Sequence, residues 1–196
     1  MKGASPLTRK EIQKVLRATT SIRERAMLVL GFTTGFRVSA LLSLTVEDVS
    51  TNGVIHNRVT ARAKFAKTKT GHTVILNSDC KKALESLLEW LKAKGADDKT
   101  PLFLSRRHQP CGALKAISRQ RCHDILKGLF AMVGLVGGEY SCHSMRKSLA
   151  KFVYDTCGGR IEKVAAALGH RSLQSTISYL SFNHSDLDDA LLSMRF

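Results

Sequence analysis

Acidic residues are scarce in this sequence. Its 196 residues include 16 Asp and Glu against 31 Lys and Arg, which gives a formal net charge of +15 at pH 7. Such an imbalance in a short chain favours a polyanionic partner, and nucleic acid is the leading candidate. The basic residues are spread over the whole chain and do not gather on one amphipathic helix or tail, so we expect no membrane partner. A merely well-solvated surface is the remaining alternative.

The sequence also lacks paired cysteines and long apolar runs. The cysteines are odd in number and scattered, and none belongs to the C-x-x-C pair typical of zinc or redox sites. They are Cys80, Cys111, Cys122, Cys142 and Cys157. The longest apolar run, Ala26 to Phe32, is far too short to cross a bilayer, and the N-terminus shows no signal sequence. We therefore expect a soluble, cytoplasmic protein with reduced thiols, associated with the nucleoid when bound to DNA.

No internal repeat, low-complexity tract or clear linker interrupts the chain, so we predict one domain over residues 1–196. Helical periodicity begins at the capping box Thr8-Arg9-Lys10-Glu11 and recurs along most of the sequence. The expected helices cover about residues 9–18, 23–33, 38–46, 78–94, 113–133, 142–150 and 160–168, with a last amphipathic segment at 185–196. Between them, strand patterns at 54–56, 58–65 and 73–76 predict a small antiparallel sheet. The predicted fold class is α+β, mainly α-helical, with a three-stranded sheet on one edge.

Basic residues on several of these segments are candidates for contacts with DNA phosphates. The predicted helix from Ala113 to Val133 is long and basic, as suits a helix that runs along a duplex groove or backbone. The candidates outside the catalytic motifs are Lys67 on the hairpin, Arg106 and Arg107 in a loop, and Lys115, Arg119 and Arg121 on the long helix.

The stretch from Leu168 to Leu180 contains the most suggestive pair. Gly169 can end one helix at a left-handed position and Ser172 can cap the next, which places His170 on a short turn. Tyr179 then follows about two turns into the second helix. The two side chains could meet at one phosphate, or they could be a core tyrosine beside a solvated histidine.

Four motifs in a fixed order strengthen the first interpretation. They are Thr34-Gly35-Phe36-Arg37-Val38-Ser39, Lys69-Thr70-Gly71 on the hairpin, His143-Ser144-Met145-Arg146, and Leu168-Gly169-His170 with Tyr179. In this order and spacing they resemble the catalytic domain of the tyrosine recombinases, also called phage-type integrases. The resemblance extends from about Leu7 to the last helix.

This resemblance implies a role for each matching residue. Arginine forks bind phosphate oxygens bidentately and balance the growing charge of a pentacoordinate transition state, a role implied for Arg37 and Arg146. Tyr179 would be the nucleophile that forms a 3′-phosphotyrosine link, with His143 assisting its deprotonation. His170 would bind a phosphate oxygen. Lys69, or Lys67 in its place, would protonate the leaving 5′ oxygen.

The implied enzyme is a site-specific DNA recombinase that integrates, excises or inverts DNA of a mobile element without metal, ATP or other cofactor. The family acts as a tetramer on paired DNA sites, exchanges a terminal helix such as 185–196 between subunits, and can use accessory DNA-bending proteins. A type IB topoisomerase and a non-cutting regulator of a full-length recombinase are the alternatives.

Two departures from the family pattern bear on these expectations. Ala40 stands where members commonly carry an acidic residue, so the support of the site is either supplied elsewhere or missing. The sequence has no N-terminal core-binding domain, which indicates either a fragment or a compact form like the fimbrial phase-variation recombinases. Because a break and a loose tail follow Tyr179, we also expect this nucleophile to be poorly placed in an isolated chain.

Overall fold

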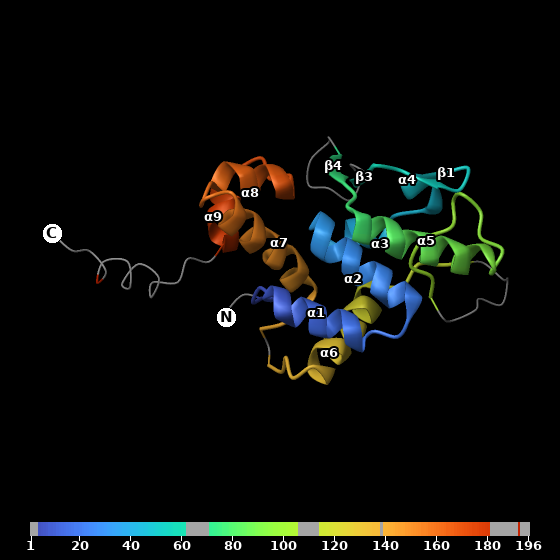
Figure 1. Ribbon diagram of the computed structural model, residues 1–196, viewed down its shortest axis with the longest axis horizontal. Helices are drawn as coiled ribbons and strands as arrows, with labels where there is room; N and C mark the ends of the chain where they lie inside the picture. The colour runs from blue at the N-terminus through green and yellow to red at the C-terminus, as the bar shows by residue number, and fades with distance from the viewer. Residues whose placement is uncertain (1–3, 62–70, 106–113, 138, 181–191, 193–196) are drawn as a thin grey trace.

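The computed structural model describes residues 4–61, 71–105, 114–137, 139–180 and 192. Within this part, the mainly helical fold with small antiparallel sheets is confirmed (Figure 1). The helices are α1 (Arg9–Ala18), α2 (Ile22–Thr34), α3 (Val38–Leu42), α4 (Val46–Val49), α5 (Ser78–Lys92), α6 (Arg119–Met132), α7 (Cys142–Thr156), α8 (Ile161–Leu168) and α9 (Leu173–Leu180). The strands are β1 (Ser50–Thr51), β2 (Val54–Ile55), β3 (Arg58–Ala61) and β4 (His72–Ile75).

Helix α2 lies at the centre of the main core. It begins at Ser21, whose hydroxyl accepts a hydrogen bond from the Glu24 amide, and it ends at Gly35 in a left-handed conformation. Side chains on every side of the helix are buried, as its nearly continuous apolar sequence predicts. Helix α5 packs against α2, and α7 also contacts it. Its C-terminal end therefore has a fixed position close to α7.

A second, smaller apolar cluster joins α7, α8 and α9, which stack together at one end of the molecule (Figure 1). Its buried members are Ala150, Val164 and Leu168, and the ring of Tyr179 packs against them. Because α7 also contacts α2, the seam between the two clusters runs along this helix. The candidate site lies at that seam.

The strands are paired differently from the predicted three-stranded sheet. The described residues form two separate two-stranded sheets, β1 with β2 and β3 with β4. Asn52 and Gly53 both have positive φ, 51° and 80°, as a two-residue hairpin turn requires, so β2 folds back on β1. The predicted strand at 54–56 therefore does not pair with β3. The pairing of β3 with β4 is confirmed, with Ala61 opposite His72.

The long basic helix is shorter than predicted. Its first helical residue is Arg119, and the hydroxyl of the preceding Ser118 accepts a hydrogen bond from the Arg121 amide. The residues before it are extended, because Ala116 bridges to Leu104 and the Lys115 carbonyl accepts from the Ser105 amide at 2.7 Å. Lys115 is therefore not on the helix.

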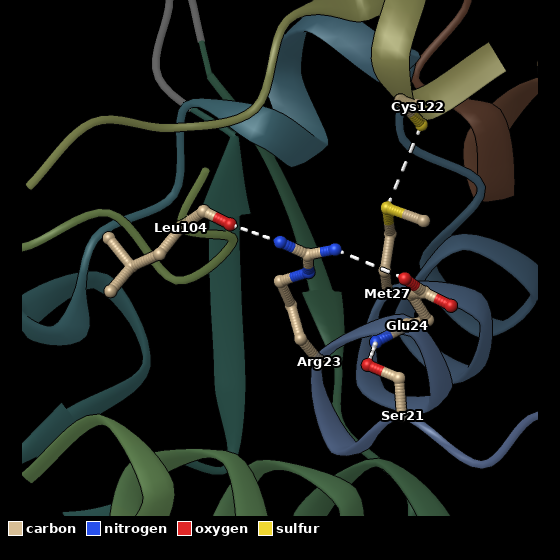
Figure 2. Close-up of polar contacts among 6 residues, drawn as sticks. All are labelled: Ser21, Arg23, Glu24, Met27, Leu104 and Cys122. Carbon is tan, nitrogen blue, oxygen red and sulfur yellow. Dashed lines mark hydrogen bonds and ion pairs between the residues drawn. The ribbon is translucent and has the colours of Figure 1, made fainter. Parts of the chain in front are cut away.

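A buried arginine attaches the segment around Leu104 to the core (Figure 2). Arg23 is 4% exposed and donates one guanidinium N–H to the carbonyl of Leu104. Its other terminal nitrogen lies 3.1 Å from Oε1 of Glu24. On the neighbouring turn, the thiol of Cys122 contacts the sulfur of Met27 at 3.6 Å, so α6 and α2 meet beside this ion pair.

Several predicted features lie outside the described residues: Lys67, Lys69, Arg106, Arg107 and most of the terminal helix 185–196. Among the segments the structure does describe, no helix combines the length and apolarity needed to cross a membrane.

Candidate active site

Arg146 is the residue around which the site is built. It lies on the first turns of α7, which starts at the capping box of Ser141 and Ser144. The side chain is 4% exposed. One terminal nitrogen donates to the carbonyl of Gly35, and the other donates to the carbonyl of Leu168 at 2.7 Å. The guanidinium thus joins the main core to the α7–α8–α9 cluster.

Both of these carbonyls belong to the C-terminal ends of helices. Gly35 ends α2 and Gly169 ends α8, each in the left-handed region with φ of 59° and 63°. Helix C-termini carry partial negative charge and stabilise a nearby cation. Burial, followed by the charge of Arg37, lowers the pKa of Arg146 to about 10, so the guanidinium remains protonated at neutral pH.

Arg37 supplies a second positive charge. It is half-buried in the turn before α3, directly after the Gly35-Phe36 turn. Its charge contributes to lowering the pKa of Arg146 and of His170, and it opposes the rise that burial causes in the pKa of Tyr179. Among the described residues, neither arginine forms an ion pair with a carboxylate, and Ala40 is 3% exposed in the core. Two adjacent arginines without an acidic partner favour binding of a dianionic or monoanionic ligand such as a phosphodiester.

Tyr179 packs against two cationic side chains of α7, Arg146 and Lys147. The Arg146 guanidinium carbon lies 5.9 Å from the centroid of the tyrosine ring, and Nζ of Lys147 lies 5.8 Å from it. The hydroxyl is buried and has no hydrogen-bond partner within bonding geometry among the described residues. Burial raises the pKa of Tyr179, while the charges of Arg146 and Arg37 act in the opposite direction.

This packing counts against the prediction that Tyr179 would be poorly placed in an isolated chain. The α7–α8–α9 cluster holds the ring within one chain, because Tyr179 and Leu180 pack against its buried members. The apolar positions of α9 were visible in the sequence, but their packing partner on α7 was not.

His170 lies on the turn between α8 and α9, as predicted. Its ring meets the ring of Tyr179 edge to face, with 5.7 Å between centroids. Its Nδ1 is 2.9 Å from the hydroxyl of buried Thr176, and its Nε2 has no hydrogen-bond partner among the described residues. Burial and the charges of Arg146 and Arg37 lower the pKa of His170 to about 4, so the imidazole is neutral at pH 7.

His143 is not brought to the other site residues. It lies three positions before Arg146 on α7, and its side chain is exposed. Its backbone amide donates to the hydroxyl of Ser141, and its side chain forms no hydrogen bond to a described residue. Lys115, Arg119 and Arg121 are also exposed, and their contact with DNA stays a prediction.

Three residues of the site were not predicted from the sequence. Thr176 orients His170, Lys147 lies over the Tyr179 ring, and His72 contacts the turn that holds His170. The position of Thr176 six residues after His170, on the next helix, was a usable signal. His72 is distant in sequence and gave none.

Comparison with known proteins identifies the family. Residues 6–185, most of the chain, match the model of the phage integrase family. The chain belongs to this family. Among curated members, it is 29% identical over 188 residues to the tyrosine recombinase XerC of Caldanaerobacter subterraneus subsp. tengcongensis, with 94% of this chain and 49% of that protein covered.

Two further similarities concern size and fold. The fimbriae regulatory protein FimE of Escherichia coli is 27% identical over 184 residues, with 90% of this chain and 85% of FimE covered. The site-specific recombinase XerH, in a pre-cleavage complex with its difH substrate, matches with a TM-score of 0.71 at 21% identity, over 97% of this chain and 55% of XerH. The chain thus spans about half the length of the XerC relative and most of FimE.

Proposed function

We propose that the protein is a site-specific DNA recombinase that cleaves and rejoins strands through a 3′-phosphotyrosine intermediate. The observation that carries this proposal is the position of Tyr179 beneath the buried guanidinium of Arg146, with His170 against the same ring. A pure DNA-binding surface would not need a buried tyrosine hydroxyl beside two arginines without acidic partners. Family membership and the DNA-bound XerH relative support the same conclusion.

In the proposed reaction, the phosphodiester lies between Arg37 and Arg146. The Tyr179 oxygen attacks phosphorus as its proton passes to His143, and the bond from phosphorus to the 5′ oxygen breaks. The arginines stabilise the charge that develops on the non-bridging oxygens, and the neutral His170 donates from Nε2. His143 would complete the set once DNA is bound, and Lys69, outside the described residues, would protonate the 5′ oxygen.

Burial raises the pKa of Tyr179, and this bears on when the nucleophile becomes reactive. In the free protein, burial keeps the hydroxyl protonated, so the chain does not hold a reactive phenolate in the absence of DNA. The resulting 5′-hydroxyl can attack the phosphotyrosine of a partner strand, which would need a second DNA site. We therefore also propose assembly of several copies on paired sites, with the segment 185–196 exchanged between them.

A non-cutting DNA-binding regulator is the second candidate, favoured by Ala40 and the exposed side chain of His143. The proposal can be tested without knowing the target sequence. The chain is incubated with a pool of duplexes that have a randomised core and a nick beside it, and protein-linked DNA is isolated under denaturing conditions and sequenced.

Enriched covalent adducts that disappear in Tyr179→Phe support the recombinase. Tight binding of the same pool without an adduct supports the regulator. Once a target sequence is known, Holliday-junction formation supports recombination, and relaxation of a supercoiled plasmid without junctions supports a topoisomerase.

A further inference from the structure

His72 connects two parts of the molecule that are far apart in sequence. It is the first residue of β4, and its Nε2 lies 3.0 Å from the carbonyl oxygen of Ala167, 95 residues later. Its ring also meets the ring of Phe36 edge to face at 5.9 Å. The side chain is half-buried, so these contacts take place at the seam between the sheet and α8.

The bond to Ala167 completes the C-terminus of α8. A helix ends with four carbonyls that have no partner within the helix, here those of residues 165–168. Two of them accept from the backbone N–H groups of Gly169 and His170. The third accepts from His72 and the fourth from Arg146. Side chains from β4 and α7 thus bind adjacent carbonyls just before His170.

His72 also lies very close to Gly169, the residue that ends α8 and precedes His170. Gly169 has no side chain, and a Cβ at this position would lie 2.6 Å from Cγ and 2.7 Å from Nδ1 of His72. The imidazole therefore lies directly on the backbone of Gly169. Burial lowers the pKa of His72 and favours the neutral ring; the bond to Ala167 acts in the opposite direction, and the charges of Arg146 and Arg37 lower the pKa further. Because a carbonyl oxygen only accepts, Nε2 carries the hydrogen of this bond.

We propose that His72 is a positioning residue that fixes the turn of residues 168–170. It would keep His170 and the Leu168 carbonyl, which binds Arg146, at the places that the reaction requires. The catalytic part of this inference rests on the proposed recombinase function. The structural part, a turn fixed by the donor at Nε2, does not.

Two amide substitutions separate this role from simple packing. The side-chain nitrogen of Gln can reach the place of Nε2, whereas that of Asn reaches only the place of Nδ1. We expect His72→Asn to lower the rate of single-turnover cleavage at saturating DNA by about 10- to 100-fold. We expect His72→Gln to stay within about threefold of the wild type, and the DNA dissociation constant to change little in both variants.

A second measurement is independent of activity. Hydrogen exchange at the backbone amides of Gly169 and His170 in the full chain should be faster in His72→Asn and close to wild type in His72→Gln. Equal exchange in the two variants and the wild type would overturn the proposal. If the wild type forms no covalent adduct, the proposed function fails, and the exchange comparison still decides whether His72 fixes the turn.

A third comparison tests whether His72 acts through the turn. In a His170→Ala background, His72→Asn should cost less in cleavage rate than it costs in the wild type, because one of the groups that it positions is gone. Equal costs in both backgrounds would show that His72 acts elsewhere. Should His72→Asn fail to fold, His72→Leu, which also lacks the donor, takes its place in all three measurements.

Discussion

Gly169→Ala should destabilise the protein more than its backbone conformation alone explains. Gly169 has φ of 63°, and a left-handed conformation costs a residue with a Cβ about 1–2 kcal/mol. The new methyl group would also lie 2.6 Å from Cγ of His72, and Cβ of His72 is already only 3.1 Å away, so rotation of the ring cannot relieve the contact. Such overpacking adds about 1–3 kcal/mol.

Gly158→Ala is the matched control. Gly158 has nearly the same φ, 65°, but nothing lies within 4 Å of a Cβ at that position. The two substitutions thus share the backbone cost, and the difference between them measures the contact with His72. We expect Gly169→Ala to reduce the free energy of unfolding by about 1–3 kcal/mol more than Gly158→Ala does.

Urea unfolding, followed by far-UV circular dichroism, measures both losses as a shift in midpoint at constant m-value. In a His72→Ala background, most of the extra loss at Gly169 should disappear, because only the Cβ of residue 72 remains near the turn. Equal losses for the two glycines, or an extra loss that persists without the imidazole, would refute the packing of His72 on this turn.

Three other predictions concern Arg146, Tyr179 and His170. Arg146→Lys should lower the cleavage rate in the nicked-duplex assay by about 100-fold or more, because one ammonium group cannot bind both helix ends and the phosphate. A cleavage rate near that of the wild type would contradict this role of Arg146. Because Tyr179 contacts Arg146 of its own chain, a mixture of Tyr179→Phe and Arg146→Ala chains should yield no covalent adduct, and an adduct would indicate exchange of the nucleophile. The pKa of His170 is lower in the folded protein, so His170 is protonated in the unfolded chain first as pH falls, and the free energy of unfolding should decrease from pH 6.5 to about 4. His170→Asn should make the urea midpoint less dependent on pH in this window. An unchanged pH dependence would count against a buried, neutral His170 imidazole.

Features that depend on neighbouring residues were predictable from the sequence. The capping box at Thr8, the left-handed end of α8 at Gly169 and the turn bearing His170 follow from local chemistry, and each is present. The Asn52-Gly53 turn carried an equally strong signal, which predicts a hairpin and would have separated the sheets. Ser118 marked the true start of α6 in the same way.

Contacts between distant segments were not predictable in this way. Helical spacing placed His143 and Arg146 near one face of α7, but it could not show that one side chain would be exposed and the other buried. The bond between His72 and Ala167 depends on how the sheet packs on α8, which no local pattern encodes.

An acidic residue at position 40 would help to hold the arginines of the site, and two helix ends take over this role here. Arg146 is buried without a carboxylate among the described residues, yet each of its terminal nitrogens binds a carbonyl at the negative end of a helix. Partial charges of this kind orient a guanidinium without neutralising it. More of the positive charge of Arg37 and Arg146 is then left for a phosphate than a buried carboxylate would leave. The C-terminal ends of two helices, each closed by a left-handed glycine, thus explain how a chain with Ala40 can still bring two arginines and a tyrosine to one place.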